Sequence, residues 1–330
     1  MTLLVKFWGT RGSLPSPVKH KDIIQLLDDL VIQAKKQGIK DIDTFINTVK
    51  SEHLIHPLSY GGNTTCIEIS KAQESFIVDM GSGLREVGTT YVGKGRKEFN
   101  IFLTHMHWDH IVGLPFFLPI YIPGNHIVIH HVHENTPEFV KINFNGVNFP
   151  VKFDTLPARI EFKKIPLYQA KKIGSFSVTP FQLDHPGNAY GYRFENQDKV
   201  ATKAITIGID SEYKRMTSES FKDDYQYYKN CDLLVFDGQY EMAELANKFD
   251  WGHCSPNLGV DLALREGIRR IVIAHHDPWS DREKLQRMYD NTKKYLQTQF
   301  HSYKNNWTSI NKEGPKLYFA YDGLEIDVSK

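Results

Sequence analysis

Four side chains of metal-ligating types occur within six consecutive positions, in the stretch Thr-His-Met-His-Trp-Asp-His that ends at His110. The apolar run 100–103 before it is typical of a strand. Residues two apart in an extended segment point the same way, so His105 and His107 can hold one metal ion together. Asp109 and His110 follow where an apolar run predicts the start of a helix, and a turn there can direct both toward a second ion. This ligand set suits Zn(II) and tolerates Mn(II) or Fe(II).

Three later strands also lead into residues of metal-ligating types. Each strand is a short apolar run, and residues at the ends of such strands are held rigidly at one edge of a sheet. The runs and the residues that follow them are 176–183 with His185, 204–209 with Asp210, and 270–274 with the pair His275 and His276. These residues are further candidate ligands, and the adjacent histidines leave the last position open between two alternatives.

The pattern H-x-H-x-D-H resembles the metal-binding motif of the metallo-β-lactamase superfamily of metallohydrolases. The resemblance implies three further ligands at the tips of later strands, which His185, Asp210 and His275 match. It favours His275 over His276, because the family places this ligand nearest to the strand end. The implied site binds two divalent ions, with zinc favoured, through seven side chains: His105, His107, Asp109, His110, His185, Asp210 and His275.

Further segments look like one branch of that superfamily, a phosphodiesterase branch related to RNase Z and described as similar to cyclic-nucleotide phosphodiesterases. The matching segments are 7–15, 60–66, 76–83, 251–255, 275–278 and 320–324. The resemblance covers nearly the whole chain except residues 18–57. It implies an α/β fold with two mixed sheets face to face and helices on both outer faces, which is a four-layer αβ/βα sandwich formed by residues 1–330 as one domain.

Residues 18–57 have the pattern of an inserted helical hairpin. Apolar residues recur at helical spacing in 23–34 and again in 42–49, and Gly38 between them is a candidate C-cap and turn. Such a hairpin cannot bury both apolar stripes alone, so we expect it to pack on the main domain or on a second subunit, as a lid or a dimer element, with an ornamental surface hairpin as the alternative. Its six lysines balance six acidic residues, so it offers no basic arm for tRNA.

His253 is the candidate that separates phosphodiester hydrolysis from lactone or β-lactam hydrolysis. In RNase Z-like enzymes, a histidine in a Gly-His-Ser/Thr context reaches the scissile phosphate. Here the context is Gly-His-Cys-Ser, with Cys254 inserted between the histidine and the serine. A leaving alkoxide is strongly basic and benefits from a general acid, which is the role that the resemblance implies for His253. The alternative is an ordinary loop histidine.

Two groups of residues complete the expectations for the site. Asp109 is expected both to bind metal and to accept a proton, and Asp79, at a strand end, to orient a ligand histidine or to cap the glycine turn after it. The candidates for the same orienting role or for substrate contact are Arg11, Asn63, Thr64 and His276. In contrast, we expect the histidines at positions 130, 131 and 133 to be exposed to solvent at a strand end.

Composition limits the remaining classes of protein. A length of 330 residues with 41% hydrophobic content is enough for a substantial core, and no run of about eighteen apolar residues predicts a membrane span. The segment 1–10 lacks the features of a signal peptide and predicts a strand. Three scattered cysteines predict buried thiols in a reducing cytoplasm rather than a disulfide framework. The net charge of +1 excludes a generally basic protein that coats nucleic acid.

These observations favour a cytoplasmic, metal-dependent phosphodiesterase. Two divalent ions with two carboxylates and a bridging hydroxide leave one net positive charge, which a phosphodiester monoanion neutralises, and the hydroxide attacks phosphorus. Small cyclic nucleotides are the favoured substrates. The alternatives are an RNase Z-like endoribonuclease on tRNA precursors, disfavoured by the near-neutral charge, a lactone or β-lactam hydrolase, and a metal-binding sensor without enzymatic activity.

Overall fold

The computed structural model of the chain describes residues 2–50, 59–196, 202–213, 224–303 and 314–330. In this part of the chain the strands form two seven-stranded sheets. The first sheet has, in spatial order, β14 (Glu325–Asp327), β1 (Leu3–Gly9), β2 (Cys66–Lys71), β3 (Glu74–Val78), β4 (Glu98–Phe102), β5 (His126–His131) and β6 (Arg159–Lys164). The second has β13 (Lys316–Phe319), β12 (Arg270–Ala274), β11 (Leu233–Asp237), β10 (Lys203–Gly208), β9 (Ala189–Asn196), β8 (Phe176–Leu183) and β7 (Lys171–Ile173).

Both sheets are mixed, as expected. Strands β3 to β6 are parallel in the first sheet, and strands β10 to β13 are parallel in the second, while hairpin-like antiparallel pairs flank them. Strand β8 is antiparallel to β9, which is antiparallel to β10, so β8 and β10 run in the same direction. The strands that precede the candidate ligands therefore end at a common edge within each sheet.

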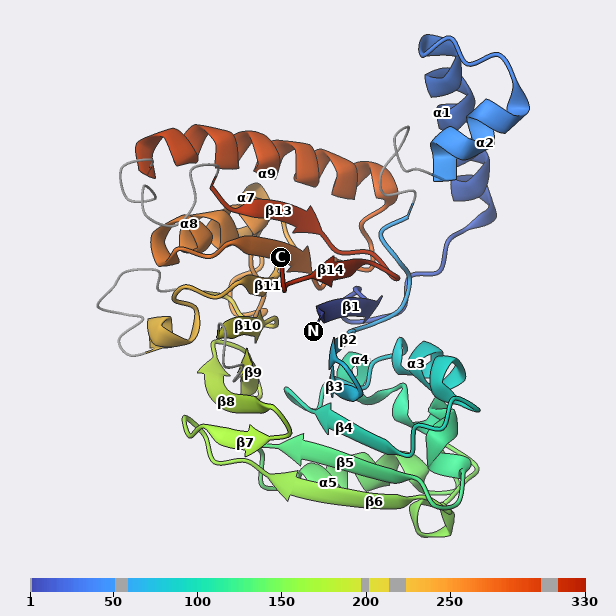
Figure 1. Cartoon of the computed structure of the whole chain (residues 1–330), viewed down its shortest axis with the longest axis vertical. Coiled ribbons are helices and arrows are strands. Elements are labelled where there is room, and N and C mark those ends of the chain that lie inside the picture. The colour runs from blue at the N-terminus through green and yellow to red at the C-terminus, as the bar shows by residue number, and fades with distance from the viewer. Residues whose placement is uncertain (1, 51–58, 197–201, 214–223, 304–313) are drawn as a thin grey trace.

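The sheets bury a shared core between them because strand residues alternate between two faces. Phe102 and Val272 point into this central core, whereas their neighbours Ile101 and Ile271 pack outward against helices. Helix α3 (Leu84–Tyr91) covers the outer face of the first sheet, and helices α8 (Pro256–Glu266) and α9 (Arg282–Tyr303) cover that of the second (Figure 1). This arrangement confirms the predicted four-layer sandwich.

Shorter helices connect these layers. They are α4 (Trp108–Ile111), α5 (Thr136–Lys141), α7 (Met242–Leu245) and the 3-10 helices η1 (Leu114–Phe116), η2 (Leu118–Tyr121), η3 (Ile142–Phe144), η4 (Phe153–Thr155) and η5 (Asp224–Tyr227). The three cysteines are buried free thiols, as predicted. Among the helices of the described ranges, none has both the length and the apolar character that a membrane span requires.

The predicted hairpin consists of α1 (His20–Lys36) and α2 (Ile42–Lys50), which project from the sandwich (Figure 1). Gly38 has a φ of +72°, and the amide of Ile39 donates to the carbonyl of Ala34, so the predicted turn is confirmed. Residues 51–57 of the predicted insertion lie outside the described residues. In α1 only Leu30 and Ala34 are buried, so most of its apolar stripe is without cover from the described residues.

We expect that deleting residues 20–55, with a short linker in their place, leaves metal content unchanged and reduces self-association. The family motifs lie outside this segment, while side chains such as Ile23 and Leu27 are about half exposed. Light scattering after size exclusion, with elemental analysis, measures both effects. Ile23→Lys with Leu27→Lys is the matched variant that keeps the helices. A soluble deletion variant without metal would instead make the hairpin part of the core.

The expectation of solvent exposure is wrong for His130 and His131, whereas His133 is partly exposed. His130 and His131 are only 3% and 5% exposed. The ring of His130 stacks on Phe102 at 4.6 Å, and its Nε2 donates to Oδ1 of Asn100 at 2.9 Å, while His131 bonds the carbonyl of His133. The partners of His130 lie about thirty residues earlier in the sequence, on the neighbouring strand β4. Burial, followed by the nearby lysines at positions 163 and 171, lowers the pKa of His130 to about 3.

This burial of His130 predicts an acid-sensitive fold. Its pKa is depressed in the folded state, so its contribution to stability is fully present above about pH 6.5 and is lost as the pH falls from there toward 3. Between pH 7 and pH 5 the loss in free energy of unfolding should be about 2 kcal/mol greater for the wild type than for His130→Gln. Urea unfolding at pH 7 and at pH 5 measures the free energy of unfolding of both proteins. Equal losses in the wild type and in His130→Gln would contradict a depressed pKa of His130.

Candidate metal centre

The seven predicted ligands come together where strands of both sheets end. After β4 the chain turns into the single-turn helix α4, which places His105, His107, Asp109 and His110 around one point. The loops after β8, β10 and β12 add His185, Asp210 and His275. The side chains of His107, His185 and their neighbours therefore converge although they are far apart in sequence.

The side chains form two groups with a shared carboxylate. In one group, Nε2 of His185 lies 3.1 Å from Nδ1 of His107, and the rings of His105 and His107 are 4.4 Å apart. The other comprises Asp109, His110 and His275, with 3.2 Å from Nε2 of His110 to Oδ2 of Asp109. The potential ligand atoms of each group lie within 4.8 Å of one another.

Asp210 lies between the two groups. Its Oδ2 is 3.1 Å from Nε2 of His110, its Oδ1 is 3.1 Å from Nε2 of His275, and Oδ1 is 3.9 Å from Nε2 of His185. A carboxylate that lies close to imidazoles of both groups can serve both as a common ligand. This is the arrangement expected of a site for two cations.

Buried atoms without hydrogen-bond partners fit bound cations. Nε2 of His105 is buried without a hydrogen bond from any described residue, and Nε2 of His110 and Oδ2 of Asp210, although 3.1 Å apart, form no hydrogen bond of acceptable geometry. Such atoms are costly unless something else satisfies them. Burial also lowers the pKa of His105 well below its usual value, so its imidazole is neutral, as metal coordination requires.

The charges around His110 lead to the same conclusion. Burial lowers its pKa, but the carboxylates of Asp109, Asp210 and Asp79 outweigh burial and raise it well above the usual value. The buried carboxylates thus require positive charge at this point, and without a cation the imidazole must take up a proton to supply it. A divalent ion supplies that charge and replaces the proton. The residues present therefore fit a two-metal site.

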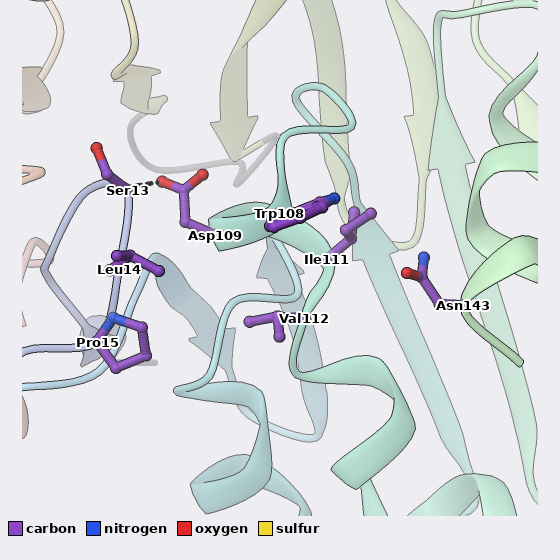
Figure 2. Close-up of a pocket in the computed structure, with 8 residues that line it drawn as sticks. All are labelled: Ser13, Leu14, Pro15, Trp108, Asp109, Ile111, Val112 and Asn143. Carbon is purple, nitrogen blue, oxygen red and sulfur yellow. Dashed lines mark hydrogen bonds between the residues drawn. The ribbon is translucent and has the colours of Figure 1, made fainter. Parts of the chain in front are cut away.

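A second layer of contacts fixes the orientation of the candidate ligands. Nδ1 of His110 is 2.8 Å from Oδ2 of Asp79, which agrees with the orienting role expected for Asp79. Nδ1 of His185 donates to the carbonyl of Gly252 at 2.9 Å, and Nδ1 of His275 is 3.1 Å from Oγ1 of Thr65. The backbone amide of Ser13 donates to Oδ2 of Asp109 at 2.8 Å (Figure 2). These bonds leave Nε2 of each of these rings directed at the site.

Three residues of this centre adopt left-handed backbone conformations. Asp79, Asp210 and His275 have φ values of 65°, 60° and 60°. This region is unfavourable for residues with a Cβ, although aspartate tolerates it better than most. Each residue follows a strand, and the left-handed turn swings its side chain out of the strand direction into the centre. Such conformations are typical of functional sites, where surrounding contacts maintain them.

The other four predicted site residues hold loops together. The guanidinium of Arg11 donates to the carbonyls of Gly61, Asp277 and Ser280. The remaining contacts are those of Asn63 and Thr64 with Ser82, and of Nε2 of His276 with the carbonyl of Ala320. These contacts give them a supporting role around the centre. Of the adjacent histidines His275 and His276, it is His275 whose ring faces the candidate carboxylate ligands.

His253 lies beside the centre and is oriented by an aspartate that the sequence interpretation did not include. Nδ1 of His253 donates to Oδ2 of Asp237 at 2.9 Å, and its ring stacks on that of His275 at 5.1 Å. Asp237 is fully buried and also accepts from the amides of Asp210 and Cys254. Its carboxylate therefore orients His253 and leaves Nε2 of that ring free of any described partner.

A signal for Asp237 is present in the sequence. The apolar run 233–236 ends at this aspartate in the same way that other strands end at the candidate ligands. Cys254, inserted in the Gly-His-Ser context, is buried, and its amide is one of the groups that Asp237 binds. The insertion therefore takes part in positioning the histidine.

Comparison with known proteins agrees with this geometry. The beta-lactamase superfamily domain matches residues 96–276, which include all seven candidate ligands. Ribonuclease Z of Prochlorococcus marinus (strain MIT 9515) is 23% identical over an alignment of 280 residues that covers 71% of this chain and 88% of that protein. Ribonuclease Z of Streptococcus gordonii is 28% identical over 173 residues, which is 52% of this chain and 54% of that protein.

Solved structures share the fold. The unliganded yeast PDE1 superposes with a TM-score of 0.64 at 14% identity and covers 99% of both chains. The short form of human tRNase Z superposes with a TM-score of 0.58 at 16% identity and covers 98% of this chain and 99% of that one. Because the superfamily domain matches more than half of the chain and contains the whole candidate centre, this protein belongs to the beta-lactamase superfamily.

Proposed function

We propose that this protein is a metal-dependent phosphodiesterase with two divalent ions, and that its substrates are small cyclic nucleotides. The observation that carries the proposal is the pair formed by His253 and Asp237, which lies against a centre built for cations. The names of the relatives support phosphodiester chemistry, because they include ribonuclease Z. The unpaired buried thiols agree with the proposed cytoplasmic location.

The ligand sets follow from the two groups. His105, His107 and His185 would hold one ion, Asp109, His110 and His275 the other, and Asp210 both. Bound there, divalent ions activate water near neutral pH and stabilise negative charge on phosphate oxygens. The nitrogen-rich donor set favours zinc, with Mn(II) or Fe(II) as the alternatives.

The chain's own residues orient the substrate and move protons. The carboxylate of Asp237 holds His253 with Nε2 free, and this nitrogen donates a proton to the leaving oxygen as the bond to phosphorus breaks. Asp109, held by the amide of Ser13, accepts the proton of the attacking water. The buried position of His253, 8% exposed, limits access of bulk water to that proton.

The near-neutral net charge of the chain favours a small substrate over tRNA. The net charge is +1, and the helical hairpin carries equal numbers of basic and acidic residues. Proteins that grip RNA through its phosphates need concentrated positive charge, and their affinity then falls steeply with salt. Cleavage of tRNA precursors is the second candidate, and the ribonuclease Z relatives are the observation that favours it. Hydrolysis of a lactone or β-lactam gives no role to the pair of His253 and Asp237.

Assays of the metal-loaded protein test the proposal. The panel comprises 3′,5′- and 2′,3′-cyclic nucleotides, a tRNA precursor with a 3′ trailer, and a simple lactone. The expected result is a kcat/KM for at least one cyclic nucleotide that exceeds those for the other two substrate types. Preferred cleavage of the precursor would replace the proposal with the endonuclease, and turnover of the lactone alone would refute phosphodiesterase activity.

A further inference from the structure

A small apolar cavity adjoins the metal centre at Asp109. Its volume is about 150 Å³. It is lined by Ser13, Leu14, Pro15, Trp108, Asp109, Ile111, Val112 and Asn143 (Figure 2). Trp108 is 78% exposed and Leu14 is 55% exposed, although both are large apolar side chains. Apolar surface of this kind beside a polar site indicates a place for an apolar part of a ligand.

Each exposed tryptophan among the described residues lies within four positions, along the sequence, of a candidate ligand or of His253. Trp108 stands between His107 and Asp109, and the others are Trp251, two residues before His253, and Trp279, four residues after His275. Of the three, only Trp108 lines the cavity. Trp108 begins the helical turn that also carries Asp109 and His110, so a group stacked on its ring would lie beside a phosphate bound at the centre.

We propose that this cavity is the base subsite, in which the nucleobase of the substrate stacks on the ring of Trp108. The inference rests on the proposed function and names the part of the substrate that the cavity selects. Pockets for a whole drug-sized ligand measure roughly 300–1,000 Å³, so this cavity holds a single ring system while the phosphate lies over the centre. Stacking on an aromatic side chain is favourable for every base, because each has a π face.

The lining of the cavity favours an uncharged group over the phosphate. Leu14, Pro15 and Val112 give it apolar walls, and a neutral base loses less solvation energy there than a charged phosphate does. Asn143 supplies a polar contact, since its amide nitrogen donates to the carbonyls of Phe139 and Val140 and leaves Oδ1 to accept. Ring and exocyclic N–H groups of bases are donors that match it, whereas an alkyl chain has none.

Equilibrium binding tests the subsite without turnover. The metal-loaded protein is titrated by calorimetry with adenosine 5′-monophosphate and with ribose 5-phosphate, which has the same phosphate and sugar but no base. The wild type should bind the nucleotide more tightly. Trp108→Ala should weaken nucleotide binding about ten- to a hundredfold and bring the two affinities together, and Trp108→Phe should restore much of the difference. Trp279→Ala is the matched control, because this tryptophan is exposed but lies outside the cavity.

The outcomes separate the subsite from the proposed function. An affinity ratio that is unchanged in Trp108→Ala, with metal content equal to that of the wild type, would overturn the base subsite even if the protein hydrolyses cyclic nucleotides. Tighter binding of hexyl phosphate than of the nucleotide, lost in Trp108→Ala, would overturn it in favour of an alkyl chain. A wild type that hydrolyses no phosphodiester, tested with bis-p-nitrophenyl phosphate, would refute the proposed function, while the affinity ratio would still report on the base.

Discussion

Replacing His253 with alanine should lower kcat for a cyclic nucleotide on the order of a hundred- to ten-thousand-fold, with both metal ions retained. In the proposed mechanism, Nε2 of His253 acts on the leaving oxygen, where charge appears only as the bond breaks. Its contribution therefore belongs to the transition state, and KM should change little. Steady-state kinetics with elemental analysis of the same samples measure both properties.

A substrate with a better leaving group distinguishes proton donation from phosphate binding. Bis-p-nitrophenyl phosphate releases a nitrophenolate that needs no proton, so the defect of His253→Ala should shrink for it. Equal losses on both substrates would assign His253 to phosphate binding. Asp237→Asn should lower kcat in the same substrate-dependent way, because the amide no longer accepts with both oxygens from the histidine and from the amides of Asp210 and Cys254.

Asp210→Asn should abolish stable binding of two metal ions and with it the activity. The wild type should contain two ions per chain. Asp210 contacts both groups of histidines, and its negative charge offsets the charge of the bound ions. Loss of a residue that only orients a ligand typically costs ten- to a hundredfold in metal affinity, so loss of a shared ligand should exceed about a hundredfold. Asparagine tolerates the φ of 60° at this position, so the change removes charge without new backbone strain.

The control for this variant is Asp250→Asn. Asp250 also has a positive φ, of 64°, but its side chain is exposed on the surface, so metal content should stay at two ions. Inductively coupled plasma analysis gives the counts, and circular dichroism confirms the fold. A wild type that is active and metal-replete with at most one ion would exclude the dinuclear mechanism, whatever the variant does.

The ligands could be predicted from the sequence because each lies in the segment that follows a strand. Strand periodicity and the residue after each apolar run are local features, and the sheet brings such positions to one edge. Asp237 has the same feature, but an aspartate before glycine at a strand end also fits a plain turn. Only the folded chain brings it to His253, sixteen residues later.

The remaining differences depend on contacts between distant segments. Arg11 has a side chain of the type that binds phosphate, yet its guanidinium donates hydrogen bonds to three loop carbonyls. Burial of His130 depends on stacking with Phe102 of the neighbouring strand. Trp108 could not be assigned to a cavity, because the opposite wall comes from Leu14 and Asn143, which are remote from it in the chain. Spacing along one strand or helix carries no information about such pairs.

The left-handed backbone at Asp79, Asp210 and His275 lowers the stability of the fold at the positions that form the candidate centre. Conformations of this kind cost roughly 1–3 kcal/mol each, a sizeable part of the 5–15 kcal/mol that keeps a typical domain folded. Glycine would relieve the cost at each position and would remove a group from the centre. If variants of this chain were selected for heat resistance alone, we therefore expect glycine to replace these three residues. Such variants should be folded and more stable than the wild type, but inactive.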